Sequence, residues 1–396
     1  MMPAVALAAQ AALAIVAIAL ALLTTYLVVL TVAAAFASKH GPPAAGGSRR
    51  FAVLVPAHNE EALIGRLLES LAQMQYPREQ YDVCVVADNC TDATASIARA
   101  AGARVYERVD DRERAKGFAL RWLLQRLRDE AQAYDAYLVL DADTVVAPNF
   151  LRAMDARLEA GSKVIQAYYS VQNAHQSRVA GLRYAALAAV HYVRPLGRSL
   201  FGFSCGLKGN GMCFAAPVLE RFSWNWFTLA EDVEFHLALV GAGIRVDFAP
   251  ETAVYADMPV SLAQAASQNA RWERGRLQLV RQHVPRLVLD GLRHASLLRL
   301  DAAAEQLIPP LSVPFALGGL CMVLAAVVGS PEIALLAAAS LVGQVAYLMA
   351  GLLMVRAPLS MYLALSAAPV YIAWKVGLYG RALVTGSATS WVRTAR

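Results

Sequence analysis

Apolar residues dominate both ends of the chain, whereas the long central part mixes apolar and polar positions in ordinary proportion. Residues 3–37 contain no charged side chain, and about 20 apolar residues are enough to span a bilayer. The pattern therefore predicts one long or tilted transmembrane helix in an N-terminal segment, 1–38. A linker rich in glycine and proline follows over 39–50.

Basic residues are found only on one side of this first apolar segment. No Lys or Arg precedes it, whereas Lys39, Arg49 and Arg50 follow it closely. Cytoplasmic flanks of membrane helices carry such an excess of positive charge. We therefore expect an integral protein of the inner or plasma membrane, whose N-terminus lies outside and whose central part lies in the cytoplasm.

Short apolar runs alternate with helical patterns from residue 51 to residue 255. The runs at 51–55, 82–87 and 137–140 predict buried strands, and the segments between them have helical periodicity. This alternation predicts a mostly parallel, doubly wound α/β domain over 51–255. In such domains the functional groups gather at the carboxyl ends of the strands.

The C-terminal part is apolar again and predicts two or three membrane helices within 304–383. Three apolar stretches are present: 307–329, 333–355 and 359–373. Pro309 and Pro310 interrupt the first, so we expect it to be kinked or only partly spanning. Three full spans would place the basic tail, 384–396, outside. Because that charge favours the inside, one stretch is expected to be re-entrant or interfacial.

Composition supports a membrane protein, since 58% of the residues are hydrophobic and only 17% are charged. The net charge is +6, and arginines are dense within 256–303, which we interpret as amphipathic helices at the membrane interface. Aromatic residues are nearly missing from that stretch, which argues against nucleic-acid binding. The five cysteines show no C-x-x-C spacing, so neither a zinc site nor a disulfide is expected.

Two acidic motifs carry candidate chemistry. Asp141 and Asp143 follow a predicted strand and, if the chain stays extended, their side chains point the same way. Two carboxylates together with diphosphate oxygens suit Mg²⁺ or Mn²⁺, although a turn or a helix N-cap would use the same residues. Glu231 and Asp232 open a predicted helix, where Asp232 could act as a base and Glu231 could tune it. Acidic residues in a first turn can equally serve the helix dipole.

A third group combines an arginine and a tryptophan. Arg271 could bind diphosphate oxygens, and Trp272 could form a wall of a pocket for a second substrate. The same pair near a membrane often anchors a helix at the interface. Lys116 precedes a predicted helix, a position where lysines are usually only solvated. Each of these signals is weak by itself.

Taken in order, the motifs resemble those of the family 2 inverting glycosyltransferases. They are Val55-Pro-Ala-His-Asn-Glu-Glu61, Asp88-Asn-Cys-Thr-Asp92, Lys116-Gly117, Asp141-Ala-Asp143, Glu231-Asp232 and Gln268-x-x-Arg271-Trp272. The chain is most similar in motifs to the membrane-integrated branch, which includes cellulose, hyaluronan and poly-N-acetylglucosamine synthases and ceramide glucosyltransferase. The resemblance implies a GT-A fold, that of nucleotide-diphospho-sugar transferases, flanked by transmembrane helices.

The resemblance also implies a role for each motif. Donor binding would fall to Pro56, His58, Asn59, Glu60, Asp88, Lys116 and Asp141. The metal, Mg²⁺ or Mn²⁺, would be held by Asp143 and Asp141. Asp232 would be the catalytic base with Glu231 beside it. Acceptor and diphosphate contacts would come from Gly209, Asn210, Gly211, Gln268, Arg271 and Trp272. Asn89 and Cys90 depart from the second acid and Gly-Ser of many relatives, which weakens any role of Asn89 in base recognition.

The expected activity is inverting, metal-dependent transfer of a sugar from a nucleotide-sugar, with a UDP-sugar favoured, to a membrane-associated acceptor. The acceptor is either a membrane lipid or a growing glycan, and the Gln-x-x-Arg-Trp motif occurs with both. A catalytically silent scaffold that binds nucleotide-sugars for a partner synthase is an alternative, and a transporter is another. The few spans, and the lack of intramembrane charged pairs in the sequence, argue against the transporter.

Overall fold

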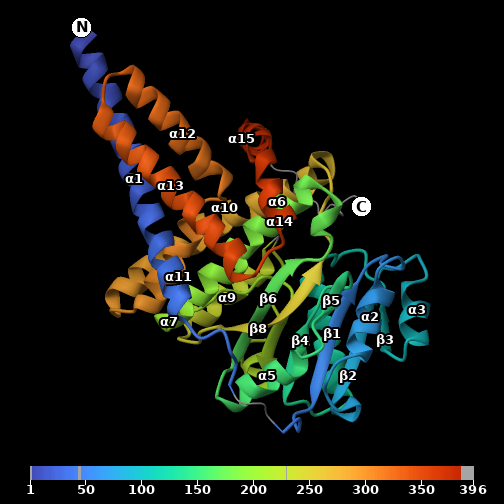
Figure 1. Ribbon diagram of the computed structural model, residues 1–396. Helices are drawn as coiled ribbons and strands as arrows, with labels where there is room; N and C mark the ends of the chain where they lie inside the picture. The colour runs from blue at the N-terminus through green and yellow to red at the C-terminus, as the bar shows by residue number, and fades with distance from the viewer. Residues whose placement is uncertain (1, 43–45, 229, 385–396) are drawn as a thin grey trace.

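The computed structural model describes residues 2–42, 46–228 and 230–384 and has two parts. An α/β domain contains all the strands, and a helical bundle projects from one of its ends (Figure 1). The N-terminus lies at the far end of that bundle. The basic tail expected from the sequence lies almost wholly outside the described residues.

The α/β domain is built on one eight-stranded sheet with the order β3-β2-β1-β4-β7-β6-β8-β5. The strands are β1 (Phe51–Ala57), β2 (Tyr81–Asp88), β3 (Arg104–Arg108), β4 (Ala136–Val139), β5 (Thr144–Val146), β6 (Val164–Val171), β7 (Met212–Ala215) and β8 (Asp247–Ala256). The first four in that order pair in parallel, as do β6 and β8. Strands β7 and β5 run antiparallel to their neighbours, so the sheet is more mixed than the sequence predicts.

Helices cover both faces of this sheet, which confirms the doubly wound α/β prediction. In β1, Leu54 faces a core shared with α4 and α9, and Val53 faces a second core shared with α2 and α5. The helices of the domain are α2 (Ile64–Ala72), α3 (Thr94–Ala100), α4 (Lys116–Asp129), α5 (Phe150–Glu159), α8 (Ala216–Arg221) and α9 (Glu231–Gly241). Short 3-10 turns lie at Arg78–Gln80 and Ala174–Gln176.

The membrane bundle consists of α1 (Met2–Phe36), α12 (Ser312–Val327) and α13 (Pro331–Met354), which pack along one another (Figure 1). Three helices in the described part of the chain are long and apolar enough to cross a membrane: 6–36, 331–354 and 359–378. Helix α12 meets α11 (Leu297–Leu307) at a bend of 68°, next to the prolines where a kink was expected.

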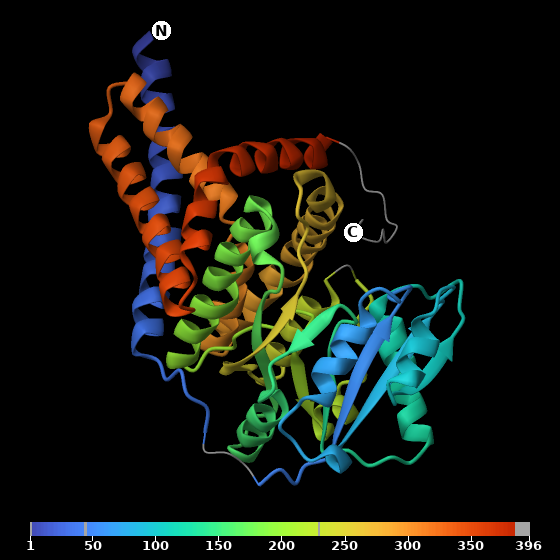
Figure 2. The ribbon, with the colours of Figure 1, turned by 45° about the vertical axis from the view of Figure 1, so that its right-hand side comes forward.

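The last helix runs in a different direction from the bundle. After α14 (Leu359–Ala364) and a 3-10 turn (Leu365–Ala367), α15 (Ala368–Val384) lies crosswise to α1, α12 and α13 (Figure 2). That one C-terminal stretch is re-entrant or interfacial stays a prediction, since α15 contributes to the segment 359–378, which is long and apolar enough to span.

Helices at the junction join the two parts into one core. The segment α6 (Arg178–Leu187), η3 (Ala188–Val193, a π-helical turn) and α7 (Arg194–Leu200) packs against α1 and α13, and α10 (Leu262–Arg293) packs against α9, α11 and α15. Gly197 allows α7 to approach α1 so closely that a Cβ there would lie 2.1 Å from the Leu30 carbonyl oxygen. The Arg198 guanidinium pairs with the carboxylates of Asp301 and Glu305, which ties α7 to α11. We did not predict from the sequence that 178–200 would contact the membrane helices.

Candidate active site

Loops at the carboxyl ends of β1 and β2 meet and bind each other. Asn59 and Asn89 both have positive φ, +55° and +51°, a region that asparagine enters more readily than most residues. The Thr91 N–H donates to the Asn59 side-chain oxygen (2.8 Å), and the Glu60 N–H donates to Thr94 Oγ1 (2.8 Å). The expected donor-binding residues Pro56, His58, Asn59, Glu60 and Asp88 therefore lie together at this edge of the sheet.

Asp88 is held by an arginine that the sequence reasoning missed. Arg108, the last residue of β3, donates from Nη1 to Asp88 Oδ1 at 2.7 Å, and both side chains are buried. Burial raises the pKa of Asp88, against the lowering effect of Arg108. The ring nitrogen Nδ1 of His58 donates to the Asp88 carbonyl at 2.7 Å. Arg108 is expected to set the orientation of Asp88. The two residues become neighbours only through the parallel pairing of β2 with β3, so the sequence alone did not show the contact.

Lys116, at the first turn of α4, connects two of the expected motifs. Its Nζ donates to Asp141 Oδ1 and to the Gly209 carbonyl oxygen, both at 2.5 Å. Burial alone would lower the pKa of Lys116, but the carboxylates of Asp141, Glu231 and Asp232 outweigh it and raise the pKa. Lys116 is therefore a partly buried cation paired within an acidic site, not a solvated surface lysine.

Asp141 and Asp143 do not continue an extended strand. The chain turns after β4, and the Thr144 N–H donates to the Asp141 carbonyl at 3.1 Å. The expectation that both side chains point the same way from an extended chain is therefore not met. No group of three or more His, Cys, Asp or Glu side chains among the described residues could hold a metal ion. A divalent cation here would need diphosphate oxygens to complete its shell, and two hard carboxylates fit that requirement.

The glycine-rich segment after α7 packs under the acidic site. Asn210 is buried, and its Oδ1 accepts from the Asp141 N–H (3.2 Å). Gln166 of β6 donates to the Asn210 carbonyl (2.8 Å) and fixes this turn from below. Gly209 and Gly211 have φ of +76° and +69°, which side chains rarely adopt. A Cβ on Gly209 would lie only 3.3 Å from Asp232 Oδ2, so the backbone passes close beside that carboxylate.

Glu231 and Asp232 begin α9 and lie within the electrostatic reach of Lys116. Burial raises the pKa of both carboxyls, and Asp232 raises that of Glu231 further. Lys116 lowers both pKa values, and Lys208 also lowers that of Asp232. A carboxylate with a raised pKa beside a cation is a suitable general base. The four motifs at Lys116, Asp141, Gly209 and Asp232 thus converge on one small volume.

The Gln-x-x-Arg-Trp motif lies on α10, on the membrane side of this site. Trp272 lies under the guanidinium of Arg183, with 5.3 Å from the guanidinium carbon to the ring centre. Gln268 Oε1 is buried and has no hydrogen-bond partner within the described ranges. The side chain of Arg271 lies outside what the structure describes, so its expected diphosphate contact stays a prediction.

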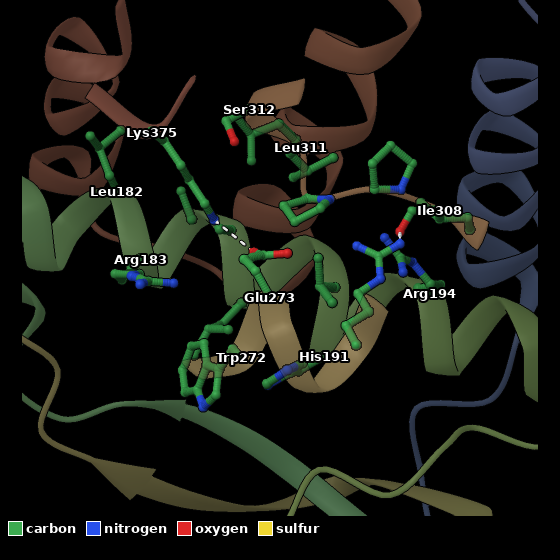
Figure 3. A pocket seen from close by; sticks show the side chains of 18 of the residues that line it. Leu182, Arg183, His191, Arg194, Trp272, Glu273, Ile308, Leu311, Ser312 and Lys375 are labelled. Atoms are coloured by element: carbon green, nitrogen blue, oxygen red, sulfur yellow. Dashed lines mark hydrogen bonds and ion pairs between the residues drawn. The ribbon is translucent and has the colours of Figure 1, made fainter. Parts of the chain in front are cut away.

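A cavity of about 330 Å³ opens between the acidic site and the membrane helices. Its lining includes Lys208 and Val233, the chain neighbours of Gly209 and Asp232. Trp272 also lines it (Figure 3). The remaining lining comes from α6, η3, α7, α9, α10, α11, α12, α13 and α15, together with the loop before β7, residues 308–311 and Leu365. The sequence pattern did not predict this pocket, because its residues come from many segments that are far apart in the sequence.

Comparison with known proteins agrees with this geometry. Residues 48–275 match the profile of the family described as glycosyltransferase like family 2. A beta-monoglucosyldiacylglycerol synthase of Nostoc sp. is 29% identical over 270 residues, which are 65% of this chain and 55% of that protein. The 4,4'-diaponeurosporenoate glycosyltransferase of Staphylococcus aureus is 49% identical, but over only 59 residues, 15% of each chain. The chain spans about half the length of the Nostoc relative.

A solved structure shows the same fold. The mannosyltransferase PcManGT from Pyrobaculum calidifontis, in complex with GDP-Man and Mn²⁺, superposes with a TM-score of 0.57 at 22% identity. The superposition covers 86% of this chain and 98% of that one. Because the family match covers more than half of the chain, the protein belongs to the family described as glycosyltransferase like family 2, and its α/β domain has the GT-A fold.

Proposed function

We propose that this enzyme transfers a sugar from a nucleotide-sugar, with a UDP-sugar as the first candidate, to a lipid acceptor in the membrane. The observation that carries the proposal is the meeting of Asp232, Gly209 and the Lys116–Asp141 pair beside a cavity that extends to the membrane helices. Asp232 supplies a base, and Lys116 supplies a positive charge next to the diphosphate. The cavity supplies an approach for an apolar acceptor.

The donor is proposed to bind along the edge formed by β1, β2 and β4. Asp88, held by Arg108, faces the nucleoside part together with the loop from His58 to Glu60. Lys116 and Asp141 lie next to the diphosphate. A bound Mg²⁺ or Mn²⁺ would neutralise the diphosphate oxygens as the leaving group departs. Asp141 and Asp143 would hold that cation.

Asp232 is proposed to accept the proton of the acceptor hydroxyl as its oxygen attacks the anomeric carbon. A single in-line displacement of this kind inverts the anomeric configuration. Lys116 keeps Asp232 ionised by lowering its pKa, and Gly209 leaves room for the acceptor because it has no side chain beside the carboxylate. Glu231 shares the same cation and adjusts the charge of the pair.

A lipid acceptor is favoured over a growing polysaccharide. The cavity walls are built from residues of the membrane-associated helices, and its volume of about 330 Å³ is in the range of small-ligand sites. The Nostoc relative is named for a glucosylated diacylglycerol, which is a glycolipid. The basic flank after α1 supports a site on the cytoplasmic side of the membrane.

The test is a donor screen with the purified full-length protein in lipid. A panel of UDP- and GDP-sugars would be incubated with Mn²⁺, with Mg²⁺ or with EDTA, and nucleoside diphosphate release would be measured. We expect one donor to be turned over, only with a divalent cation, and the label to enter the lipid fraction. Donor binding without turnover of any donor would contradict an enzyme role and favour the scaffold alternative.

A further inference from the structure

The cavity beside the active site combines apolar walls with several buried cations. The apolar side chains include Leu187, Val190, Ile308, Leu311, Phe315 and Ile372. Five basic residues also line it, Arg183, Arg194, Lys208, Arg276 and Lys375, against two acidic ones, Glu273 and Glu305. An apolar pocket with an excess of cations fits a ligand that is apolar at one end and negatively charged at the other.

Three of the five cations are bound by a carboxylate or by backbone carbonyls. Lys375 pairs with Glu273 at 3.5 Å, and Lys208 pairs with Glu305 at 3.6 Å. Arg276 donates to the backbone carbonyls of Gln306 and Ile308. His191 adds no charge near neutral pH, because burial, then Lys208, lowers its pKa to about 3.

Arg183 and Arg194 are different, because no ion pair joins either of them to a carboxylate in the described part of the chain. Their side chains are only 7% and 6% exposed. Arg183 Nε and Nη2, Arg194 Nε and Ser312 Oγ are all buried without a hydrogen-bond partner among the described residues. A buried guanidinium donor with no acceptor is costly, so such atoms indicate that a ligand completes the site.

The two arginines approach the cavity from opposite sides. Figure 3 shows Arg183 with Trp272 on one side and Arg194 near Ile308 on the other, with the Lys375–Glu273 pair above. Arg183 projects from α6 and Arg194 is the first residue of α7, so the π-helical turn between them sets their spacing. An anion in the cavity could accept from the unpartnered donors on either side.

We propose that the acceptor is an anionic lipid whose phosphate or carboxylate binds in the cavity lined by the unpartnered donors of Arg183 and Arg194 and whose head group presents a hydroxyl to Asp232. The inference rests on the proposed transferase function and names its acceptor class. The acyl chains occupy the apolar end of the cavity at α12 and α15. Trp272 covers the head group, and the arginine stacked on it is held in place by that ring.

The transfer step balances with these groups alone. The bond between the anomeric carbon and the diphosphate oxygen breaks, and its electron pair leaves with the nucleoside diphosphate. A bond forms from the lipid hydroxyl oxygen to the anomeric carbon, and the hydroxyl proton passes to the Asp232 carboxylate. The acidic group of the lipid takes no part in bond making and serves only to hold the acceptor.

The test compares lipids and arginine variants on the full-length protein in a neutral detergent. Dioleoylphosphatidylglycerol carries a phosphate and hydroxyls, whereas dioleoylglycerol carries a hydroxyl and no acid. Binding would be measured by native mass spectrometry, and sugar transfer by radiolabel in the lipid fraction. Arg183→Gln and Arg194→Gln remove one charge each, and Arg178→Gln is a matched control because Arg178 is exposed on the same helix as Arg183.

We expect the phosphate-bearing lipid to bind and accept sugar in preference to dioleoylglycerol. Arg183→Gln and Arg194→Gln should each weaken binding roughly 10-fold or more, as expected for hydrogen bonds to a charged group, and Arg178→Gln should leave it unchanged. Slow hydrolysis of the donor by water should persist in all variants, which shows that they fold and bind donor.

Equal transfer to the neutral lipid, or unchanged binding in both arginine variants, would overturn the proposal. Displacement of the lipid by inorganic phosphate alone would identify a soluble anion as the ligand and overturn it as well. Failure of the wild-type protein to hydrolyse any donor would instead refute the proposed transferase function. Failure of the lipid proposal and failure of the proposed function are therefore distinguishable.

Discussion

Gly117 offers a sharp test of how the fold positions the active site. It follows Lys116 in the first turn of α4, and a Cβ at this position would lie 2.1 Å from the Trp226 carbonyl oxygen and 3.3 Å from the Phe227 ring. The contact is with backbone, so no side-chain rotation can relieve it. The segment it would displace leads directly into Glu231 and Asp232.

Two effects of Gly117→Ala oppose each other. Alanine in a helix gains about 1 kcal/mol over glycine. An extra group forced into a packed site costs about 1–3 kcal/mol, and overlap with backbone belongs at the upper end of that range. We expect a net loss of about 2 kcal/mol in unfolding free energy, which lowers Tm by about 4–8 °C for a domain of this size.

Gly65→Ala is the matched control. Gly65 also lies in a helix, α2, but a Cβ there would have nothing within 4 Å. It should therefore stabilise the protein by up to about 1 kcal/mol. Thermal unfolding in detergent and sugar transfer would be measured for both variants, and Gly117→Ala should lose most of its activity. Equal Tm shifts in the two variants, or wild-type activity in Gly117→Ala, would refute the close approach of α4 to residues 226–227.

Two further predictions concern charge. Lys116→Gln should reduce transfer roughly 10- to 100-fold, the value of hydrogen bonds to a charged group, whereas Lys163→Gln at an exposed site should not. As pH is lowered, the wild-type transfer rate should begin to fall at a pH above the range in which an ordinary carboxyl titrates, because burial raises the pKa of Asp232. In Lys116→Gln the fall should begin at a still higher pH, because the pKa-lowering effect of Lys116 is lost. A rate profile that stays flat down to the usual carboxyl range, or that does not move in Lys116→Gln, would contradict this reasoning.

The same pKa directions set the sign of a stability change. A carboxyl whose pKa is raised by folding binds more protons in the folded state, so Glu231 and Asp232 favour folding at low pH. That contribution is lost as pH rises through their raised pKa values.

Local patterns were enough to predict the first half of the domain. The apolar runs at β1, β2 and β4 are buried strands because each is short, continuous and ended by polar residues, and the motif residues do lie at their carboxyl ends. The antiparallel placement of β7 between β4 and β6, and of β5 at the edge of the sheet, was not predictable, because pairing depends on contacts distant in sequence. The turn at Asp141–Asp143 was not predictable either, because it depends on where β5 begins, at Thr144.

Features that depend on several elements were missed for the same reason. Arg108 is an ordinary strand residue until β3 pairs with β2, which brings it to Asp88. Arg183 and Arg194 are separated by the π-helical turn and belong to a stretch whose contact with the membrane helices the pattern did not show. The cavity argued to hold the acceptor exists only where many separated helical segments meet, so no single motif indicates it.

Transfer of radiolabelled sugar to lipid by the wild-type protein, Asp232→Asn and Asp129→Asn tests the central claim most directly. Asp129 is exposed at the end of α4 and serves as the control for loss of one carboxylate. Removal of a general base lowers rates about 10²- to 10⁴-fold, so Asp232→Asn should fall in that range while Asp129→Asn matches the wild type. Wild-type transfer by Asp232→Asn would contradict the account.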